Sequence, residues 1–111
     1  MSDESVAERQ MRDVWRRSIE HYGKTLQSVV CMEECGELIQ AISKMLRGKD
    51  AKANLIEEIA DVTICLGLLR EMYGISEYEI AAMVGIKTAR EAARLNGFTV
   101  SEREERDGTA A

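Results

Sequence analysis

Proline is absent from all 111 residues, and aromatic residues make up only 5% of the chain. Because the sequence is instead rich in Ala, Glu, Leu, Arg, Met and Lys, this composition favours helix over sheet. No apolar run approaches the roughly 18 residues that a membrane span needs, and the acidic residues 1–5 do not resemble a signal peptide. The sequence therefore predicts an all-α cytoplasmic protein with no membrane partner.

Cysteine and histidine are also scarce. Cys31, Cys35 and Cys65 form an odd set with no Cys-x-x-Cys spacing, which argues against a disulfide framework and against a structural zinc site. We expect them to be reduced thiols that pack as small buried hydrophobes. The single histidine, His21, excludes the paired Glu-x-x-His motifs of di-iron helical bundles.

The chain also lacks an excess of basic residues, and its net charge is -5. This excludes the electrostatic footprint of a general nucleic-acid binder, although metal and local bases can still attract small phosphate ligands. The length suits one domain, which we expect at residues 1–97, followed by a charged, mobile tail at 98–111. A chain of 111 residues has a small hydrophobic core, which would gain stability from oligomerisation.

Apolar periodicity and end signals predict four helices in a bundle. We expect them at about residues 3–21, 25–47, 51–73 and 77–95, ending near Gly23, Gly48, Gly74 and Asn96-Gly97. The expected N-terminal caps are Thr25, Asp50 and a capping box of Ser76 with Glu79. In the first helix we expect burial of Val6, Met11, Val14, Trp15 and Ile19, and the third helix should be the most buried.

Two of these helices carry carboxylates in or beside their apolar stripes. The second contains Glu33, Glu34 and Glu37, and the third contains Glu57, Glu58 and Asp61. Residues three and four apart share a helix face, so each set forms a local acidic patch. A solvated face would mix in bases, yet residues 25–43 and 53–69 contain no Lys or Arg.

Carboxylates gathered near a core repel one another and lose hydration, so they must take up protons or surround a cation. Oxygen ligands suit a hard ion such as Mg²⁺, which shares its remaining coordination positions with water and phosphate. The two patches therefore predict a magnesium site.

Basic residues outside the patches have two interpretations. Lys44 and Arg47 either complement the dipole at a helix end or contact phosphate. The row Lys87, Arg90 and Arg94 is either a solvated face paired with Glu91 or a phosphate-binding edge. Trp15 is either a core anchor or a surface on which a base stacks.

The motif Glu33-Glu34-x-x-Glu37, followed after residues 38–57 by Glu58-x-x-Asp61, resembles the signature of MazG-like all-α nucleoside triphosphate pyrophosphohydrolases. The similarity extends over residues 26–94. It implies a magnesium-dependent enzyme, with Mn²⁺ as a substitute, that cleaves nucleoside or deoxynucleoside triphosphates between the α and β phosphates. The products would be a monophosphate and pyrophosphate, in the removal of non-standard or surplus nucleotides.

The same resemblance assigns roles to residues. Glu34, Glu37, Glu58 and Asp61 would be metal ligands, and Glu33 would act with Glu34 in catalysis by holding a further ion or the attacking water. Relatives form homodimers or homotetramers in which neighbouring subunits help to complete the site. The fourth helix departs from the pattern, because Glu91 stands where relatives often carry Asn.

Two other function classes remain open from the sequence. A non-catalytic module that senses nucleotide or metal would keep most of these features, and a structural helical dimer would explain the apolar stripes. The uncompensated carboxylates favour the enzyme or the sensor, since a scaffold does not need them. Magnesium-dependent stabilisation would separate the scaffold from both.

Overall fold

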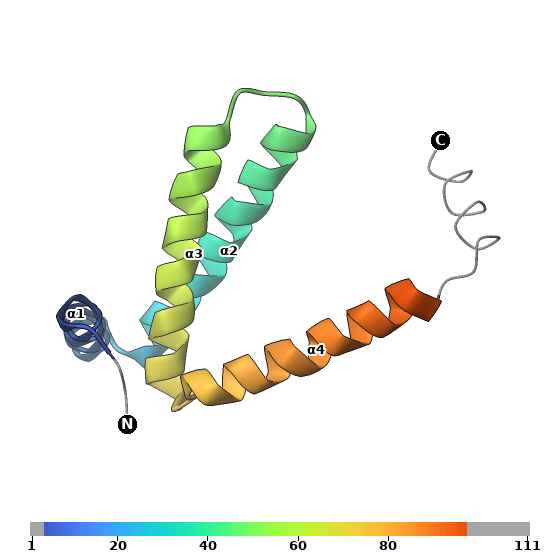
Figure 1. The fold of residues 1–111 in the computed structure, drawn as a ribbon. Helices are drawn as coiled ribbons and strands as arrows, with labels where there is room; N and C mark the ends of the chain where they lie inside the picture. The colour runs from blue at the N-terminus through green and yellow to red at the C-terminus, as the bar shows by residue number, and fades with distance from the viewer. Residues whose placement is uncertain (1–3, 98–111) are drawn as a thin grey trace. The chain divides into compact units, whose positions relative to one another are not determined.

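The computed structural model describes residues 4–97, which form four α-helices and no strand (Figure 1). They are α1 (Val6–Tyr22), α2 (Lys24–Leu46), α3 (Lys52–Tyr73) and α4 (Glu77–Gly97). This confirms the prediction of an all-α chain with four helices. One compact unit, which contains α1, α2 and α3, ends at Ile75, and a second unit, which contains α4, begins at Ser76. The tail expected at 98–111 lies outside the described residues.

Helices α2 and α3 lie side by side as an antiparallel hairpin, and α1 packs against both (Figure 1). The buried apolar centre consists of Cys31 from α2 with Cys65 and Leu68 from α3. Trp15 and Ile19 from α1 pack against it, as do Leu69 and Met72. Helix α3 has the most extensive contacts with the other helices of this unit and the most buried residues of any helix, as the sequence predicts.

Two predicted end signals are confirmed. Gly74 ends α3 in the left-handed conformation, with φ of 65°, where a residue without Cβ is favoured. Before α4, the Glu79 N–H donates to Ser76 Oγ over 3.1 Å, and the Ser76 N–H donates to Glu79 Oε2 over 2.7 Å. This reciprocal pair is the predicted capping box.

Two predicted caps are wrong. Helix α2 begins at Lys24, directly after Gly23, so Thr25 lies inside the helix. The reason is the backbone of Gly23, whose φ of 89° lets the chain leave α1 and enter α2 through a single residue. The N-cap of α3 is Ala51 and not Asp50, and no side chain caps either helix.

The burial expected for α1 is also partly wrong. Trp15 and Ile19 face the core, but Val6, Met11 and Val14 are 63%, 49% and 52% exposed. The orientation of α1 explains the difference. Arg12 and Arg16 both pair with Glu71 of α3, over 3.2 and 3.0 Å, so the face that carries them turns toward α3. Val14 lies on the opposite side of the helix.

Gly67 in α3 provides the contact surface for Trp15. A Cβ added at Gly67 would lie 2.5 Å from Trp15 Cζ3, so only glycine lets the indole ring approach this closely. We expect Gly67→Ala to displace the ring and to lower stability by roughly 1–3 kcal/mol, the usual cost of overpacking. Thermal unfolding followed by circular dichroism measures this loss.

Gly36 in α2 is the matched control, because a Cβ added there meets no atom within 4 Å. Gly36→Ala should therefore stabilise the chain by up to about 1 kcal/mol through helix propensity. If both variants shift the melting temperature in the same direction, the close contact between Gly67 and Trp15 does not control stability.

Candidate metal centre

The hairpin of α2 and α3 brings the two acidic patches together. Glu34 and Glu37 lie one turn apart on α2, and Glu58 and Asp61 lie one turn apart on α3. One carboxylate oxygen from each of Glu34, Glu37 and Glu58 lies within 4.8 Å of the other two. Three of the four predicted metal ligands thus form a compact cluster of oxygen atoms.

Two of these carboxylates are withdrawn from water. Glu58 is only 8% exposed and Glu34 is half-buried, whereas Glu37 is exposed at the edge of the cluster. Glu34 Oε2 and Glu58 Oε2 are both buried and have no hydrogen-bond partner. A buried carboxylate oxygen without a partner is costly, so each of these atoms has the capacity to bind a cation.

The raised pKa of Glu34 reflects the same crowding of carboxylates. Burial raises the pKa of Glu34 above its ordinary value, and repulsion from Asp61 and Glu37 raises it further. The effect of Asp61 on Glu34 places Asp61 beside the cluster. Without a cation, Glu34 therefore holds its proton more tightly than an ordinary glutamate does.

Glu58 behaves in the same way. Burial raises its pKa, followed by repulsion from Glu37, Asp61 and Glu57. Lys44 acts in the opposite direction, and its effect is the smallest of those named. The charge of the cluster is therefore not balanced by neighbouring side chains.

These observations fit a hard divalent cation. The available donors are carboxylate oxygens from two rigid helices, two of them lacking any other partner. A divalent ion would satisfy those oxygens and relieve the repulsion among the acids. Glu34, Glu37 and Glu58 have the geometry to hold it, with Asp61 next to them.

The predicted catalytic residue Glu33 lies next to this cluster in the chain. It belongs to α2 and its side chain is exposed, so it is accessible to water and to a ligand. Glu34, also predicted to be catalytic, is the half-buried member of the pair. Adjacent positions of one helix thus present an exposed and a withdrawn carboxylate.

The predicted phosphate contacts divide between the two units. Lys44 belongs to α2 and acts electrostatically on Glu58, while Arg47 Nε donates to the Ser43 carbonyl oxygen over 3.4 Å at the end of α2. The predicted row of bases on α4 is exposed, and Arg94 pairs there with Glu91. These row residues are Lys87, Arg90 and Arg94. The contact of Arg47 at the end of α2 agrees with its interpretation as a residue that complements the helix dipole. The pairing of Arg94 with Glu91 agrees with the interpretation of the row as a solvated face.

Cysteine thiols lie next to the cluster. Cys31 and Cys65 are buried, as predicted, but Cys35 is exposed, which the sequence interpretation got wrong. Cys35 lies one turn beyond Cys31 in α2, but its side chain is exposed. Burial raises the pKa of Cys65 to about 12, and the thiol of Cys31 contributes through a hydrogen bond.

Sequence reasoning missed the contacts that hold α1 and the hairpin together. Besides the pairs of Arg12 and Arg16 with Glu71, the Gln27 amide donates to Ser18 Oγ over 2.6 Å, and Ser28 Oγ lies 2.8 Å from Tyr73 Oη. Most of these join residues far apart in the chain, so periodicity gave no signal. A local signal was available for α1, because Ser5 and Glu8 have the spacing of the capping box that they form.

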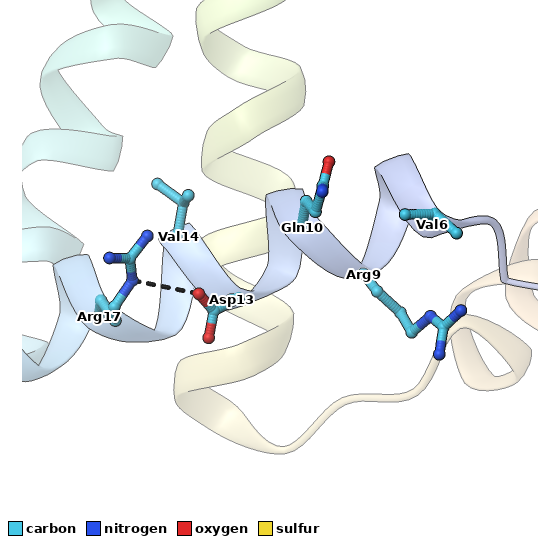
Figure 2. Close-up of a pocket in the computed structure, with 6 residues that line it drawn as sticks. All are labelled: Val6, Arg9, Gln10, Asp13, Val14 and Arg17. Carbon is cyan, nitrogen blue, oxygen red and sulfur yellow. Dashed lines mark ion pairs between the residues drawn. The ribbon is translucent and has the colours of Figure 1, made fainter.

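A shallow depression lies on α1 (Figure 2). All its lining residues come from that one helix, and Asp13 pairs across it with Arg17 over 3.2 Å. The others are Val6, Arg9, Gln10 and Val14. None of the clustered acids of α2 and α3 lines this depression, so it does not extend the candidate metal centre.

The fold and site define an all-α protein whose central hairpin carries a cluster of carboxylates. The chain is 33% identical over 82 residues to YvdC, an uncharacterized protein of Bacillus subtilis (strain 168). The similarity covers 63% of this chain and 77% of YvdC, and the chain belongs to the same family as that protein. No family profile matches the chain, and no solved structure matches it. Within residues 4–97, no helix combines the length and apolar character needed to cross a membrane.

Proposed function

We propose that the protein hydrolyses nucleoside or deoxynucleoside triphosphates between the α and β phosphates in a Mg²⁺-dependent reaction. The observation that carries this proposal is the carboxylate cluster of Glu34, Glu37 and Glu58 with its two unpartnered buried oxygens. The resemblance of the motif to the MazG-like pyrophosphohydrolases supplies the reaction class. A role in clearing surplus or non-standard nucleotides from the cytoplasm follows from that class.

The proposal gives each acid a task. Glu34, Glu37, Glu58 and Asp61 hold the divalent ion, which when bound supplies charge neutralisation to phosphate and a lowered pKa to water. Their placement on two packed helices keeps the ligand oxygens close before substrate arrives. Mn²⁺ would bind to the same oxygen donors.

Glu33 would hold the attacking water and take its proton, while Glu34 would act in catalysis through the ion that it holds. A carboxylate can act as a general base when it lies within hydrogen-bond reach of the proton that it removes. Exposure of Glu33 on α2 leaves it free to reach a water molecule at the rim of the cluster. The reaction then needs no covalent nucleophile from the protein.

Basic side chains would bind the triphosphate. Lys44 is the base that acts on Glu58, so it is a suitable partner for phosphate oxygens near the cluster. Arg47, Lys87, Arg90 and Arg94 are further candidates, and Trp15 is the candidate for base stacking. The packing of Trp15 against Gly67 favours its role as a core anchor.

We also propose that the protein works as a homodimer or homotetramer. Helices α2 and α3 expose large apolar side chains, among them Ile39 at 67% and Ile56 at 58%. The buried apolar residues of the described chain are few and include only one large side chain, Leu68. A second copy of the chain would cover the exposed residues, since contiguous apolar surface commonly marks an interface.

Light scattering coupled to gel filtration tests this assembly. A mass of at least twice the 12.4 kDa chain is expected, and Ile39→Asp should lower it by placing a charge in the interface. Gln40→Asp is the matched control, because it adds the same charge at an adjacent exposed polar position. A parent protein of 12.4 kDa at micromolar concentration would refute the oligomer.

Product analysis by phosphorus NMR tests the reaction itself. The purified protein is incubated with a panel of ordinary and modified triphosphates, with Mg²⁺ or with a chelator. Monophosphate and pyrophosphate should form in equal amounts, and only with the metal. Nucleoside diphosphate and orthophosphate as products would show that the assigned bond is wrong, and no turnover with retained nucleotide binding would favour a sensor.

A further inference from the structure

Two buried thiols face each other across the α2–α3 hairpin. Cys31 on α2 is 2% exposed and Cys65 on α3 is 3% exposed. The Sγ of Cys31 donates to the Cys65 carbonyl oxygen over 3.7 Å, so the two cysteines are in direct contact across the hairpin. The acids of the cluster already provide ligands for a hard cation, so the proposed metal site leaves these thiols unused.

The position of the pair relates it to that site. Cys31 lies one turn before Glu34 on α2, and Cys65 lies one turn after Asp61 on α3. The thiols and the carboxylates therefore occupy neighbouring layers of the same contact between two helices. A change in helix separation at the thiol layer must reach the carboxylate layer, because packed helices move as rigid elements.

We propose that Cys31 and Cys65 form a reversible disulfide in the presence of a peroxide, and that this bond weakens divalent-cation binding by the neighbouring carboxylates. The effect on cation binding rests on the metal site of the proposed function, whereas the disulfide does not. The partner for this chemistry is a small peroxide, since the thiols are enclosed between the helices.

The chemistry balances with hydrogen peroxide as the oxidant. One thiol sulfur attacks a peroxide oxygen, the O–O bond breaks, and a sulfenic acid and one water are formed. The other thiol sulfur then displaces the sulfenic oxygen, so the S–O bond breaks, the S–S bond forms and a second water leaves. Two electrons pass from the two sulfurs to the peroxide, and the two thiol protons end in the water molecules.

The disulfide alters the geometry between the helices. Its sulfur atoms are about 2.05 Å apart, which is much closer than two sulfur atoms that are not bonded to each other can approach. Forming it draws α2 toward α3 one turn away from Glu34 and Asp61. Mg²⁺ requires a nearly ideal octahedral arrangement at about 2.0–2.1 Å, so its affinity should be sensitive to such a shift.

Burial also sets the resting state of the pair. The pKa of Cys65 is raised to about 12, so its thiol stays protonated at neutral pH and is a poor nucleophile toward peroxide. Cys31 is therefore the sulfur that attacks the peroxide, and Cys65 is the sulfur that then displaces the sulfenic oxygen. Cys35 is the competing thiol because it is exposed. Oxidation of Cys35 alone would join two chains and leave the hairpin without a cross-link.

Peptide mass spectrometry under non-reducing conditions tests the disulfide. The full chain is treated with hydrogen peroxide, alkylated and digested. We expect a peptide that links Cys31 to Cys65, with its yield unchanged in Cys35→Ser and abolished in Cys65→Ser. The disulfide proposal is overturned if the parent yields only links through Cys35, or only sulfinic and sulfonic acids at Cys31 and Cys65.

Calorimetric titration with Mn²⁺ tests the effect on the metal site. The oxidised Cys35→Ser chain should bind Mn²⁺ about tenfold more weakly than the reduced chain, and dithiothreitol should restore the affinity. Equal affinity of the two forms overturns the regulatory effect even if the cross-link is found. A reduced chain that binds no Mn²⁺ overturns the metal site of the proposed function, while the peptide assay still reports on the disulfide.

Discussion

Glu58→Gln is expected to abolish Mg²⁺-dependent turnover and to stabilise the metal-free chain. The substitution keeps the side-chain volume but removes a buried negative charge that Glu37, Asp61 and Glu57 repel. Loss of one preorganised electrostatic group in an active site costs about 10²-fold or more in rate. The metal-free variant should nevertheless melt at a higher temperature than the parent, because a neutral amide is less costly to bury than a carboxylate.

Pyrophosphate release and thermal unfolding in a chelator measure the two effects. Glu57→Gln is the matched control, since it removes a charge from the adjacent exposed position of α3. It should alter turnover by no more than a few-fold. Parental turnover in Glu58→Gln would show that the site is assigned to the wrong residues. A lower melting temperature without metal would show that Glu58 stabilises the fold as a carboxylate.

The metal-free chain is expected to become less stable as the pH rises from about 5 to 7. Glu34 and Glu58 have folded-state pKa values raised above the ordinary value of 4.5, first of all by burial. The folded state therefore holds their protons more tightly than the unfolded state. Their contribution to stability is fully present below pH 4.5 and is lost as the pH rises through the folded-state values.

Other carboxylates act in a different pH window. Hydrogen bonds from the Ser76 backbone and side chain lower the pKa of Glu79, and hydrogen bonds from Arg16 and Arg12 lower that of Glu71 against the effect of burial. Their contributions are present above pH 4.5 and are lost as the pH falls below it. Between pH 5 and 7, the change should therefore come from Glu34 and Glu58.

Melting temperatures at pH 5 and pH 7, with a chelator or with Mg²⁺, test this dependence. The metal should restore stability at pH 7, by about 2.7 kcal/mol when its concentration is one hundred times its dissociation constant. Glu58→Gln should reduce the pH dependence of the metal-free chain. A melting temperature that rises between pH 5 and 7 in the chelator would contradict the raised pKa values.

The sequence predicted the features that depend on local pattern. Helical periodicity identified four helices, and the capping box at Ser76 and the left-handed Gly74 were recognisable from short-range chemistry. The spacing of Glu34 and Glu37 on one helix and Glu58 on the next predicted their cluster. A hairpin of two adjacent helices brings such positions together once its register is set by the turn.

What the sequence could not predict depends on tertiary orientation. The face of α1 that packs inward is selected by the pairing of Arg12 and Arg16 with Glu71, which lies on another helix. The close contact of Trp15 with Gly67 is likewise long-range. Cys31 and Cys35 share one face of α2 in the sequence pattern, yet only Cys31 reaches the contact with α3.

Mn²⁺ binding followed by electron paramagnetic resonance tests the central claim most directly, because it requires no knowledge of the substrate. The claim is that the carboxylates of α2 and α3 form a divalent-cation site. We predict saturable Mn²⁺ binding to the parent chain, competition by Mg²⁺, and loss of this binding in Glu58→Gln. Equal Mn²⁺ binding by the parent and Glu58→Gln, or no saturable binding by either, would contradict the claim.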